Sequence, residues 1–397
     1  MTETDYFELL LGLSNLKVLS VSYEAKRITL TCELKSDSCT CPNCGKPTKK
    51  CNQYKHRSVR DLDISGREVW LELRIGQYHC PDCDKYFNQS EPWLLPRKSY
   101  TSRQGKWIFD LCAKQNFTAA GKILNMPAKT VERIYYEYAQ KLADVPARYA
   151  QVRKLGIDEL SHRKGKKDYV CVLVDLERNI ILDILPDRKK DTLIAHFQSL
   201  GKDFCEQIEV VCCDMWRTYV SVAKVCFPQA DITLDRFHIV KAANDVLDQF
   251  RKALRKEEPK QDAFKHLKWI LFKRTDKCTE EQKQDIQKAL DLSPKLSELY
   301  DLRNQFNTIF DEASSKKQFE QELNKWLIKA ENTEEKNMLS FTKTVKRWKK
   351  HIISFAETRI TNAATEGLNN LIRYAKRISF GLPSFKNLRL RTLMLSS

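Results

Sequence analysis

Two aspartates in this chain follow short apolar stretches of the kind that form buried strands. Asp158 ends the stretch 154–158, and Asp214 ends the stretch 210–214. Carboxylate oxygens are hard ligands that suit Mg²⁺, and two such ions can clamp the attacking and leaving oxygens of a phosphoryl transfer. Aspartates are also common turn formers, so either residue alone would equally fit an ordinary turn.

A metal site of this kind takes its third acid from a later helix. Glu366, in the segment 362–370, is the best candidate among many glutamates. The alternative is a helix-start glutamate that is favoured only by the helix dipole. Three further aspartates compete in principle with the first two, namely Asp175, Asp183 and Asp187.

Four cysteines occur in two turns of the form C-P-x-C, at 41–44 and 80–83. Each turn directs two thiolates at one point, and two turns complete a closed tetrahedral zinc site. We therefore expect one structural Zn²⁺ and a β-hairpin around 69–75 between the turns, with the ligands Cys41, Cys44, Cys80 and Cys83. Nearby side chains that could replace a ligand are Cys39, Cys51, His56 and His79.

Three short segments, 102–115, 118–124 and 128–142, have helical periodicity and short connections. One face of the third segment is apolar, with Val131, Ile134, Tyr135, Tyr138 and Leu142. The opposite face carries Lys129, Arg133, Tyr136 and Gln140. We expect this face to enter the major groove as the recognition helix of a helix-turn-helix, with DNA contacts from Lys129, Thr130 and Arg133. An ordinary three-helix bundle with a solvated polar face would show the same pattern.

The stretch 155–234 reads as three strands, a helix, a strand, a helix and a strand. This is the element order of a ribonuclease-H-like mixed sheet. No glycine occurs between Gly201 and Gly367, and 240–355 has helical periodicity, which predicts an all-helical insertion. Its three tryptophans could stack on unpaired bases, but we expect core packing for Trp269, Trp326 and Trp348.

Charge and composition favour a polyanionic partner. The 397 residues carry a net charge of +17, and residues 343–397 hold 12 Lys and Arg against two acids. A basic surface of this size favours nucleic acid, although solubility or anionic membrane binding would also account for it. The apolar runs are too short to span a bilayer and the first residues lack a signal peptide, so we expect reduced cysteines and a cytoplasmic protein.

Taken together, these residues resemble the DDE transposases of bacterial insertion sequences of the ISL-three type, over essentially the whole chain. The resemblance depends on four signatures: 156–159 (GIDE), 214–219 (DMWRTY), 235–238 (DRFH) and 365–370 (TEGLNN). It implies a catalytic triad of Asp158, Asp214 and Glu366 that holds two Mg²⁺ or Mn²⁺ ions. The motif of Asp235 and His238 is similar to one seen in several transposase families. We interpret His238 as an anchor for the strand-to-helix transition, and direct catalysis by this motif stays open as the alternative.

The resemblance also implies the substrate. Inverted-repeat ends and target DNA are bound as double-stranded DNA, by a homodimer in the bacterial cytoplasm, with no membrane and no small-molecule substrate. Arg373, Lys376 and Arg377 extend the Glu366 helix with charge suited to the DNA backbone. Two rival functions stay open: a non-catalytic DNA-binding regulator, and a nuclease without strand transfer.

The expected architecture is a multidomain α/β protein. Its predicted parts are an N-terminal segment (1–37), a zinc ribbon (38–98), a helix-turn-helix domain (99–144), a first part of the ribonuclease-H-like catalytic core (150–239), an all-helical insertion (240–354) and a second part of the core (355–397).

Overall fold

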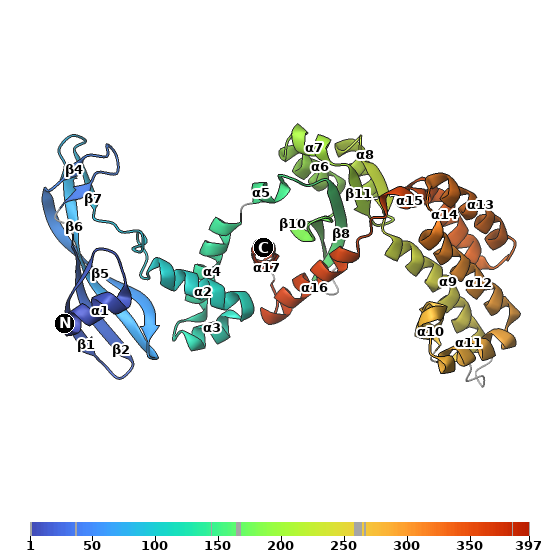
Figure 1. Cartoon of the computed structure of the whole chain (residues 1–397), viewed down its shortest axis with the longest axis horizontal. Coiled ribbons are helices and arrows are strands. Elements are labelled where there is room, and N and C mark those ends of the chain that lie inside the picture. The colour runs from blue at the N-terminus through green and yellow to red at the C-terminus, as the bar shows by residue number, and fades with distance from the viewer. Residues whose placement is uncertain are drawn as a thin grey trace. The chain divides into compact units, whose positions relative to one another are not determined.

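The computed structural model describes residues 2–35, 38–143, 145–163, 168–257, 264–265, 267–382 and 384–396. The chain forms two compact units, which Figure 1 shows from the blue N-terminus to the red C-terminus. The first unit comprises Met1–Ala143 with Ile378–Gly381, and the second comprises Asp144–Arg377 with Leu382–Ser397. Residues 37 and 144, where two of the predicted boundaries fall, lie outside the described residues.

The first unit begins with helix α1 (Glu3–Leu11) and contains a five-stranded sheet. The strands of this sheet are β1 (Leu16–Tyr23), β2 (Arg27–Leu34), β5 (Cys51–Ile64), β6 (Arg67–Cys80) and β7 (Lys85–Asn88). Their order is β1-β2-β6-β5, and β7 pairs with the end of β6. The expected hairpin between the cysteine turns is therefore the long antiparallel pair of β5 and β6.

Alternating burial explains why the N-terminal strands join this sheet. In β2, Ile28, Leu30 and Cys32 point into the core, while the residues between them are at least partly exposed. The same period of two occurs in β6, where Leu71 and Leu73 are fully buried. Because β2 pairs in parallel with β6, the predicted N-terminal segment shares one apolar core with the hairpin.

Three helices follow in the first unit: α2 (Ser102–Lys114), α3 (Phe117–Ile123) and α4 (Ala128–Leu142). The first two begin at capping side chains, because Thr101 accepts from the backbone of Gln104 and Asn116 from that of Ala119. Buried Asp61 of β5 fixes α2 to the sheet by accepting a hydrogen bond from Thr101 Oγ1 at 2.7 Å.

The second unit contains a mixed five-stranded sheet, as the sequence predicts. Its strands are β8 (Lys154–Arg163), β9 (Asp168–Asp175), β10 (Ile180–Leu185), β11 (Val210–Cys213) and β12 (Asp231–Leu234). The order is β10-β9-β8-β11-β12, with the first three antiparallel and β8, β11 and β12 parallel. Short helices accompany it: α5 (Val145–Tyr149), α6 (Lys190–Ser199), α7 (Lys202–Gln207), α8 (Arg217–Cys226) and α17 (Phe385–Leu395).

Between β12 and the last part of the chain, the described residues form only helices and turns. The helices are α9 (Arg236–Glu257), α10 (Lys268–Phe272), α11 (Glu280–Leu292), α12 (Pro294–Glu312), α13 (Lys316–Glu331), α14 (Lys336–Ile353), α15 (Phe355–Thr358) and α16 (Ala363–Ile378), with a 3₁₀ turn at Thr275–Lys277. Helix α9 starts directly after β12 and continues unbroken through residue 240, where the insertion was expected to begin. None of the helices within the described ranges is long and apolar enough to cross a membrane.

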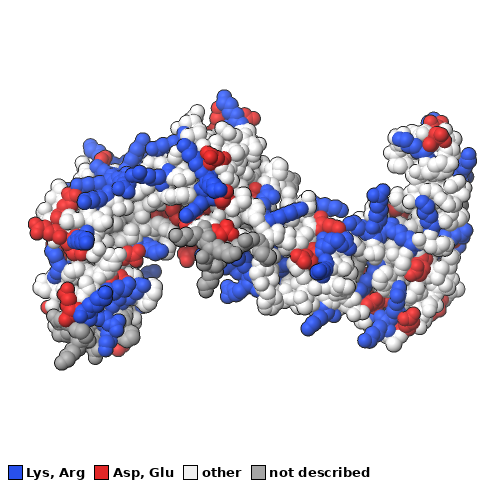
Figure 2. Space-filling view, turned by 180° about the vertical axis from the view of Figure 1, so that it is seen from behind, with Lys and Arg blue, Asp and Glu red and all other residues white. Residues whose placement is uncertain are grey.

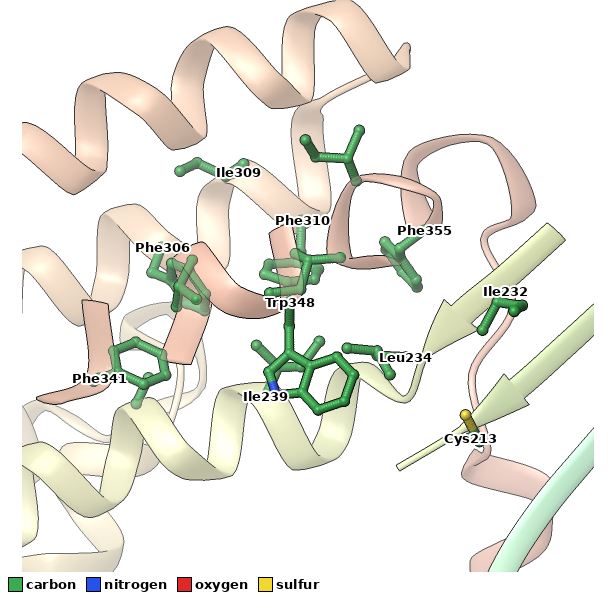
Figure 3. Close-up of a cluster of buried hydrophobic side chains, with 14 of the residues drawn as sticks. Cys213, Ile232, Leu234, Ile239, Phe306, Ile309, Phe310, Phe341, Trp348 and Phe355 are labelled. Atoms are coloured by element: carbon green, nitrogen blue, oxygen red, sulfur yellow. The ribbon is translucent and has the colours of Figure 1, made fainter. Parts of the chain in front are cut away.

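One hydrophobic core joins these helices to the sheet. Figure 3 shows Ile232 and Leu234 of β12 in the same cluster as Phe310, Trp348 and Phe355 of the helices. Trp326 and Trp348 are buried, as expected. The expectation of core packing is wrong for Trp269, which is 69% exposed and packs edge-on against the ring of Phe272.

Candidate active site and cysteine cluster

Strand register brings three aspartates to one edge of the mixed sheet. Ile157 of β8 lies opposite Cys213 of β11, so Asp158 and Asp214 are the next residues on neighbouring parallel strands. Asp235 follows β12 in the same way, and its backbone N–H donates to the Cys213 carbonyl at 2.9 Å. Asp158 lies within β8 and not at its end, because the strand continues to residue 163. The sequence analysis paired the first two carboxylates and left Asp235 without an assigned place.

His238 faces these carboxylates from the first turn of α9. Its Nε2 lies 3.2 Å from Asp214 Oδ1 and 3.9 Å from Asp235 Oδ2. Ligand atoms of Asp158, Asp214 and His238 all lie within 4.8 Å of one another. Asp214 Oδ1 is nevertheless buried without a hydrogen bond, because the imidazole nitrogen is not aligned to donate one. A buried acceptor of this kind fits a metal ion as its missing partner.

Asp235, the first residue of the motif that ends at His238, fixes the chain at the start of α9. Asp235 is 4% exposed, and its Oδ1 accepts from the backbone N–H of Phe237 at 3.3 Å and of Asn362 at 3.1 Å. The first of these bonds fixes the start of α9, and the second fixes the chain that enters α16. Asp235 therefore joins two segments that are far apart in the sequence.

The carboxylates raise one another's pKa. Burial, and then the charges of Asp158 and Asp235, raise the pKa of Asp214 to about 8. Burial is also the main cause that raises the pKa of Asp158 and the pKa of Asp235. A divalent cation would reverse this effect, because it would favour the charged form of each carboxylate. The donor set therefore fits a hard cation such as Mg²⁺.

Glu366 lines a pocket together with Asp158, Asp235 and His238. The pocket has a volume of about 220 Å³, and its lining residues are Asp158, Glu159, Asp235, Phe237, His238, Asn362, Glu366, Asn369 and Arg373. Positions 362, 366, 369 and 373 follow helical spacing, so α16 and the residue before it present one face to the pocket. Glu366 is solvent-exposed where it lines this pocket.

Two asparagines of the segment around Glu366, for which no role was predicted, hold α16 against the sheet. Asn369 Nδ2 donates to Asp158 Oδ2 at 2.6 Å, and Asn362 Nδ2 lies 3.5 Å from the Ile157 carbonyl. Gly156 makes this approach possible, because a Cβ at that position would stand 2.9 Å from Asn362 Oδ1. The close approach of α16 thus depends on the absence of a side chain in β8.

Arg188 binds Glu159, the residue after Asp158 in β8, and makes two cation–π contacts. Arg188 forms an ion pair with Glu159, and its guanidinium stacks on Tyr169 at 4.4 Å and on Trp216 at 4.5 Å. Trp216 also packs edge-on against Tyr219, at a ring distance of 4.7 Å. These contacts give a structural reason for the aromatic residues that follow Asp214.

The three competing aspartates have other partners. Asp175 binds Arg178 Nε at 2.5 Å, Asp183 binds Arg389 Nε at 2.5 Å, and Asp187 accepts from the Lys189 backbone at 2.9 Å. The contacts of Asp175 and Asp187 are local, whereas that of Asp183 joins β10 to α17. None of the three residues lines the carboxylate pocket.

The basic residues proposed to touch DNA have different surroundings. Lys129 is exposed, Thr130 is partly buried, and Arg133 is half exposed with an ion pair to Glu137 at 2.9 Å. Tyr136, expected on the polar face, packs against Phe117 instead, whereas Leu142, expected on the apolar face, is 56% exposed.

On α16, Arg373 and Arg377 are exposed, and Arg373 donates to Asn370 Oδ1 at 2.8 Å. Lys376 differs from them, because its Nζ donates to the carbonyls of Ser161 at 3.1 Å and His162 at 2.6 Å. Burial lowers the pKa of Lys376. This lysine therefore fixes α16 to β8 in the structure, a role that the sequence pattern did not indicate.

The four cysteines of the C-P-x-C turns form a second cluster, in the first unit. The sulfur atoms of Cys41, Cys44, Cys80 and Cys83 lie within 4.8 Å of one another. The first turn follows β3 (Cys39–Thr40) and precedes β4 (Pro47–Thr48). Backbone N–H groups of Cys44 and Asn43 lower the pKa of Cys41 to about 7. A closed set of four sulfur donors fits a structural zinc ion.

The four alternative ligands lie outside this cluster. Cys51 Sγ is 3.6 Å from the Gln53 carbonyl, and His79 Nε2 is 2.9 Å from Asp84 Oδ1. Cys39 interacts with Tyr78, and His56 lies on β5 opposite Arg74. The two C-P-x-C turns therefore supply the whole donor set.

Comparison with known families and proteins agrees with these two sites. Residues 155–392 match a family model of DDE transposases, ISL3 group, and residues 37–83 match the zinc-finger of transposase IS204/IS1001/IS1096/IS1165. The chain is 25% identical over 347 residues to the transposase for insertion sequence element IS1001 of Bordetella parapertussis, covering 86% of this chain and 84% of that one. It is also 25% identical over 376 residues to the transposase for IS1557 of Mycobacterium tuberculosis, covering 86% and 82%. This chain belongs to the ISL3 family of DDE transposases, which are phosphoryl-transfer enzymes.

Proposed function

We propose that this transposase binds the terminal inverted repeats of an insertion sequence, cuts the DNA there and joins the freed ends to target DNA. The observation that carries the proposal is the pocket shared by Asp158, Asp235, His238 and Glu366, with Asp214 on the neighbouring strand. A site of this kind, at the edge of a mixed sheet with strand order β10-β9-β8-β11-β12, supports a ribonuclease-H-like catalytic core.

In the proposed mechanism, Asp158, Asp214 and Glu366 would hold two Mg²⁺ or Mn²⁺ ions, which would supply positive charge at phosphorus and favour deprotonation of the attacking oxygen. Water first attacks the phosphodiester at the element's end, and the bond to the 3′ oxygen breaks. The freed 3′-hydroxyl then attacks a phosphodiester of the target, whose own 3′ oxygen leaves. Both steps displace an oxygen at phosphorus, so one site serves both.

The surrounding residues have positioning roles in this proposal. Asn369 orients Asp158 through its 2.6 Å hydrogen bond, and Asp235 holds the starts of α9 and α16 together. His238 faces Asp214 and shares the site as a further ligand or as a hydrogen-bond donor to the DNA. Arg373, on the same face of α16, reaches the bound DNA backbone.

The N-terminal modules supply the DNA reading. We propose a zinc ribbon at 38–98 with one structural Zn²⁺, and a helix-turn-helix at 99–144 that reads the repeats through α4. The catalytic core comprises 150–239 and 355–397, interrupted by the insertion at 240–354. Cutting two ends together requires a dimer on DNA.

A cleavage-and-joining assay on DNA that carries the element's inverted repeats tests the proposed function. With Mg²⁺, the purified chain should produce nicks with free 3′-hydroxyls at the repeat ends and joined products with target DNA. Nicks without joined products would make the protein a plain nuclease. Repeat binding without any nicking would make it a regulator.

A further inference from the structure

The structure contains a basic groove that is separate from the carboxylate pocket. It lies between α8 and α14, has a volume of about 410 Å³, and shares no residue with that pocket. Its polar lining consists of Arg217, Ser221 and Lys224 from α8 and Arg347 and His351 from α14, and no acidic residue lines it. Two helices that are remote in the sequence thus direct positive charge into one depression.

The cations of this groove have no acidic partner within the described part of the chain. Arg217, Lys224 and Arg347 are exposed, and none of them forms an ion pair or a side-chain hydrogen bond with another described residue. Two other lysines of α14 do have acidic partners: Lys346 pairs with Glu331 at 2.5 Å, and Lys349 pairs with Glu320 at 2.7 Å. Unpaired cations that share a concave surface indicate an anionic ligand.

The spacing of the groove suits a polymer of phosphates. Arg217 and Lys224 are seven residues apart on α8, which places them about 10 Å apart along the helix axis. One DNA strand presents a phosphate about every 3.4 Å of duplex axis, so this length spans several phosphates. Figure 2 shows further Lys and Arg side chains over the upper part of the helical body, where Figure 1 labels α13 and α14.

The shape of the groove decides what it can recognise. Base edges are recessed in the grooves of DNA and are reached by protruding elements such as a recognition helix. A concave protein surface instead receives the convex sugar–phosphate backbone, which carries no direct sequence information. The groove therefore suits a DNA that must be held irrespective of its sequence.

We propose that this groove binds the backbone of the target duplex. The inference rests on the proposed function, in which the target is the one DNA that lacks the inverted repeats. Arg217 starts α8 three residues after Asp214, so one end of the groove lies at the carboxylate edge of the sheet. A target strand in the groove would thus lead towards the carboxylates that act on it.

The test compares two double variants of the full-length protein that lose the same charge. Lys224→Gln/Arg347→Gln removes unpaired cations of the groove, and Lys346→Gln/Lys349→Gln removes paired cations from the same helical body. Binding to a duplex without repeats is measured over a range of salt concentrations. Strand transfer of pre-cut ends and cleavage of uncut ends are measured separately, with circular dichroism and thermal melting as controls for folding.

For the groove variant, the plot of the logarithm of the DNA association constant against the logarithm of salt concentration should be less steep. Its slope should be smaller in magnitude by about 1.8, because each lost phosphate contact contributes about 0.9. Strand transfer should fall about ten-fold or more at moderate salt, and cleavage should stay within about two-fold of the wild type, because the two lost contacts act on target binding alone. The control variant should resemble the wild type in all three assays.

Equal losses in both variants would show a general charge effect and overturn the proposal. A parallel loss of cleavage and transfer would assign the groove to the element's ends, and unchanged transfer would remove the groove from DNA binding. A wild-type protein that neither cuts nor joins DNA would instead defeat the proposed function itself, so the two failures are distinguishable.

Discussion

The approach of α16 to the sheet gives a sharp prediction at Gly156. A Cβ there would stand 2.9 Å from Asn362 Oδ1 and 2.8 Å from Leu176 Cδ2. Leu176 can rotate away, but Asn362 is buried and held by Asp235 and Thr365. Gly156→Ala should therefore displace the chain that enters α16, and with it Glu366.

The expected change in the free energy of unfolding follows from the packing around Gly156. Overfilling a tight core site costs about 1–3 kcal/mol in the free energy of unfolding. The matched control is Gly367→Ala, directly after Glu366 in α16, where a Cβ would meet nothing within 4 Å. That change should stabilise the helix by about 0.5–1 kcal/mol. The two variants should therefore differ by about 1.5–4 kcal/mol in the free energy of unfolding, with opposite signs relative to the wild type.

Chemical denaturation of the full chain measures these differences, and Mg²⁺-dependent cleavage measures the effect on the site. A misplacement of about 1 Å can lower a rate about 10²-fold, so cleavage by Gly156→Ala should fall further than its folded fraction does. If Gly156→Ala were as stable and as active as the wild type, the close contact between β8 and Asn362 would not position α16. Equal destabilisation by both glycine variants would also refute the reasoning.

Three further predictions concern the other sites. Cys44→Ser and Cys80→Ser should each lose about one zinc ion per chain, measured by metal analysis, and should bind repeat DNA more weakly. The control Cys51→Ser should keep the metal. Wild-type protein without zinc would contradict this prediction. Arg133→Ala should weaken repeat binding by about 1–3 kcal/mol if the side chain reads a base edge. Lys129→Ala should weaken the binding of all DNA sequences alike. Repeat binding unchanged in both variants would mean that another surface reads the DNA. In metal-free protein, Asp214 has a pKa of about 8, above its unfolded value, so its contribution to stability is present at low pH and is lost as pH rises towards and through 8. In chelator, the free energy of unfolding of Asp214→Asn should therefore fall less than that of the wild type between about pH 6 and 8, by up to about 1.4 kcal/mol for each pH unit. Identical pH profiles would refute this prediction.

The main elements of the fold could be predicted from the sequence because their signals are local. Continuous apolar runs mark the strands of the mixed sheet, and helical spacing marks α9 to α14. The two C-P-x-C turns similarly contain within four residues the geometry that aims their thiols. The cluster of Cys41, Cys44, Cys80 and Cys83 is the result.

Interactions across the fold could not be predicted in this way. The hydrogen bond of Asp235 to Asn362 joins residues 127 positions apart, and that of Asn369 to Asp158 joins residues 211 apart. No periodicity in either segment indicates the partner. Lys376 has the composition of a DNA contact, yet two backbone carbonyls of β8 bind its ammonium group. Trp269 was expected in the core, but it lies on the short helix α10 with its side chain largely exposed.

The central claim is that Glu366 acts with Asp158 and Asp214 on phosphodiester bonds. Glu366→Gln keeps the size of the side chain and removes its charge. The matched control is Glu357→Gln, because Glu357 does not line the pocket and forms an ion pair with Lys316 at 2.7 Å. The measurement is the rate of Mg²⁺-dependent cleavage at the repeat ends, with repeat binding measured in parallel. Glu366→Gln should bind the repeats like the wild type and cut them orders of magnitude more slowly, while Glu357→Gln should cut normally. Cleavage by Glu366→Gln at the wild-type rate would contradict the claim and place the third carboxylate elsewhere.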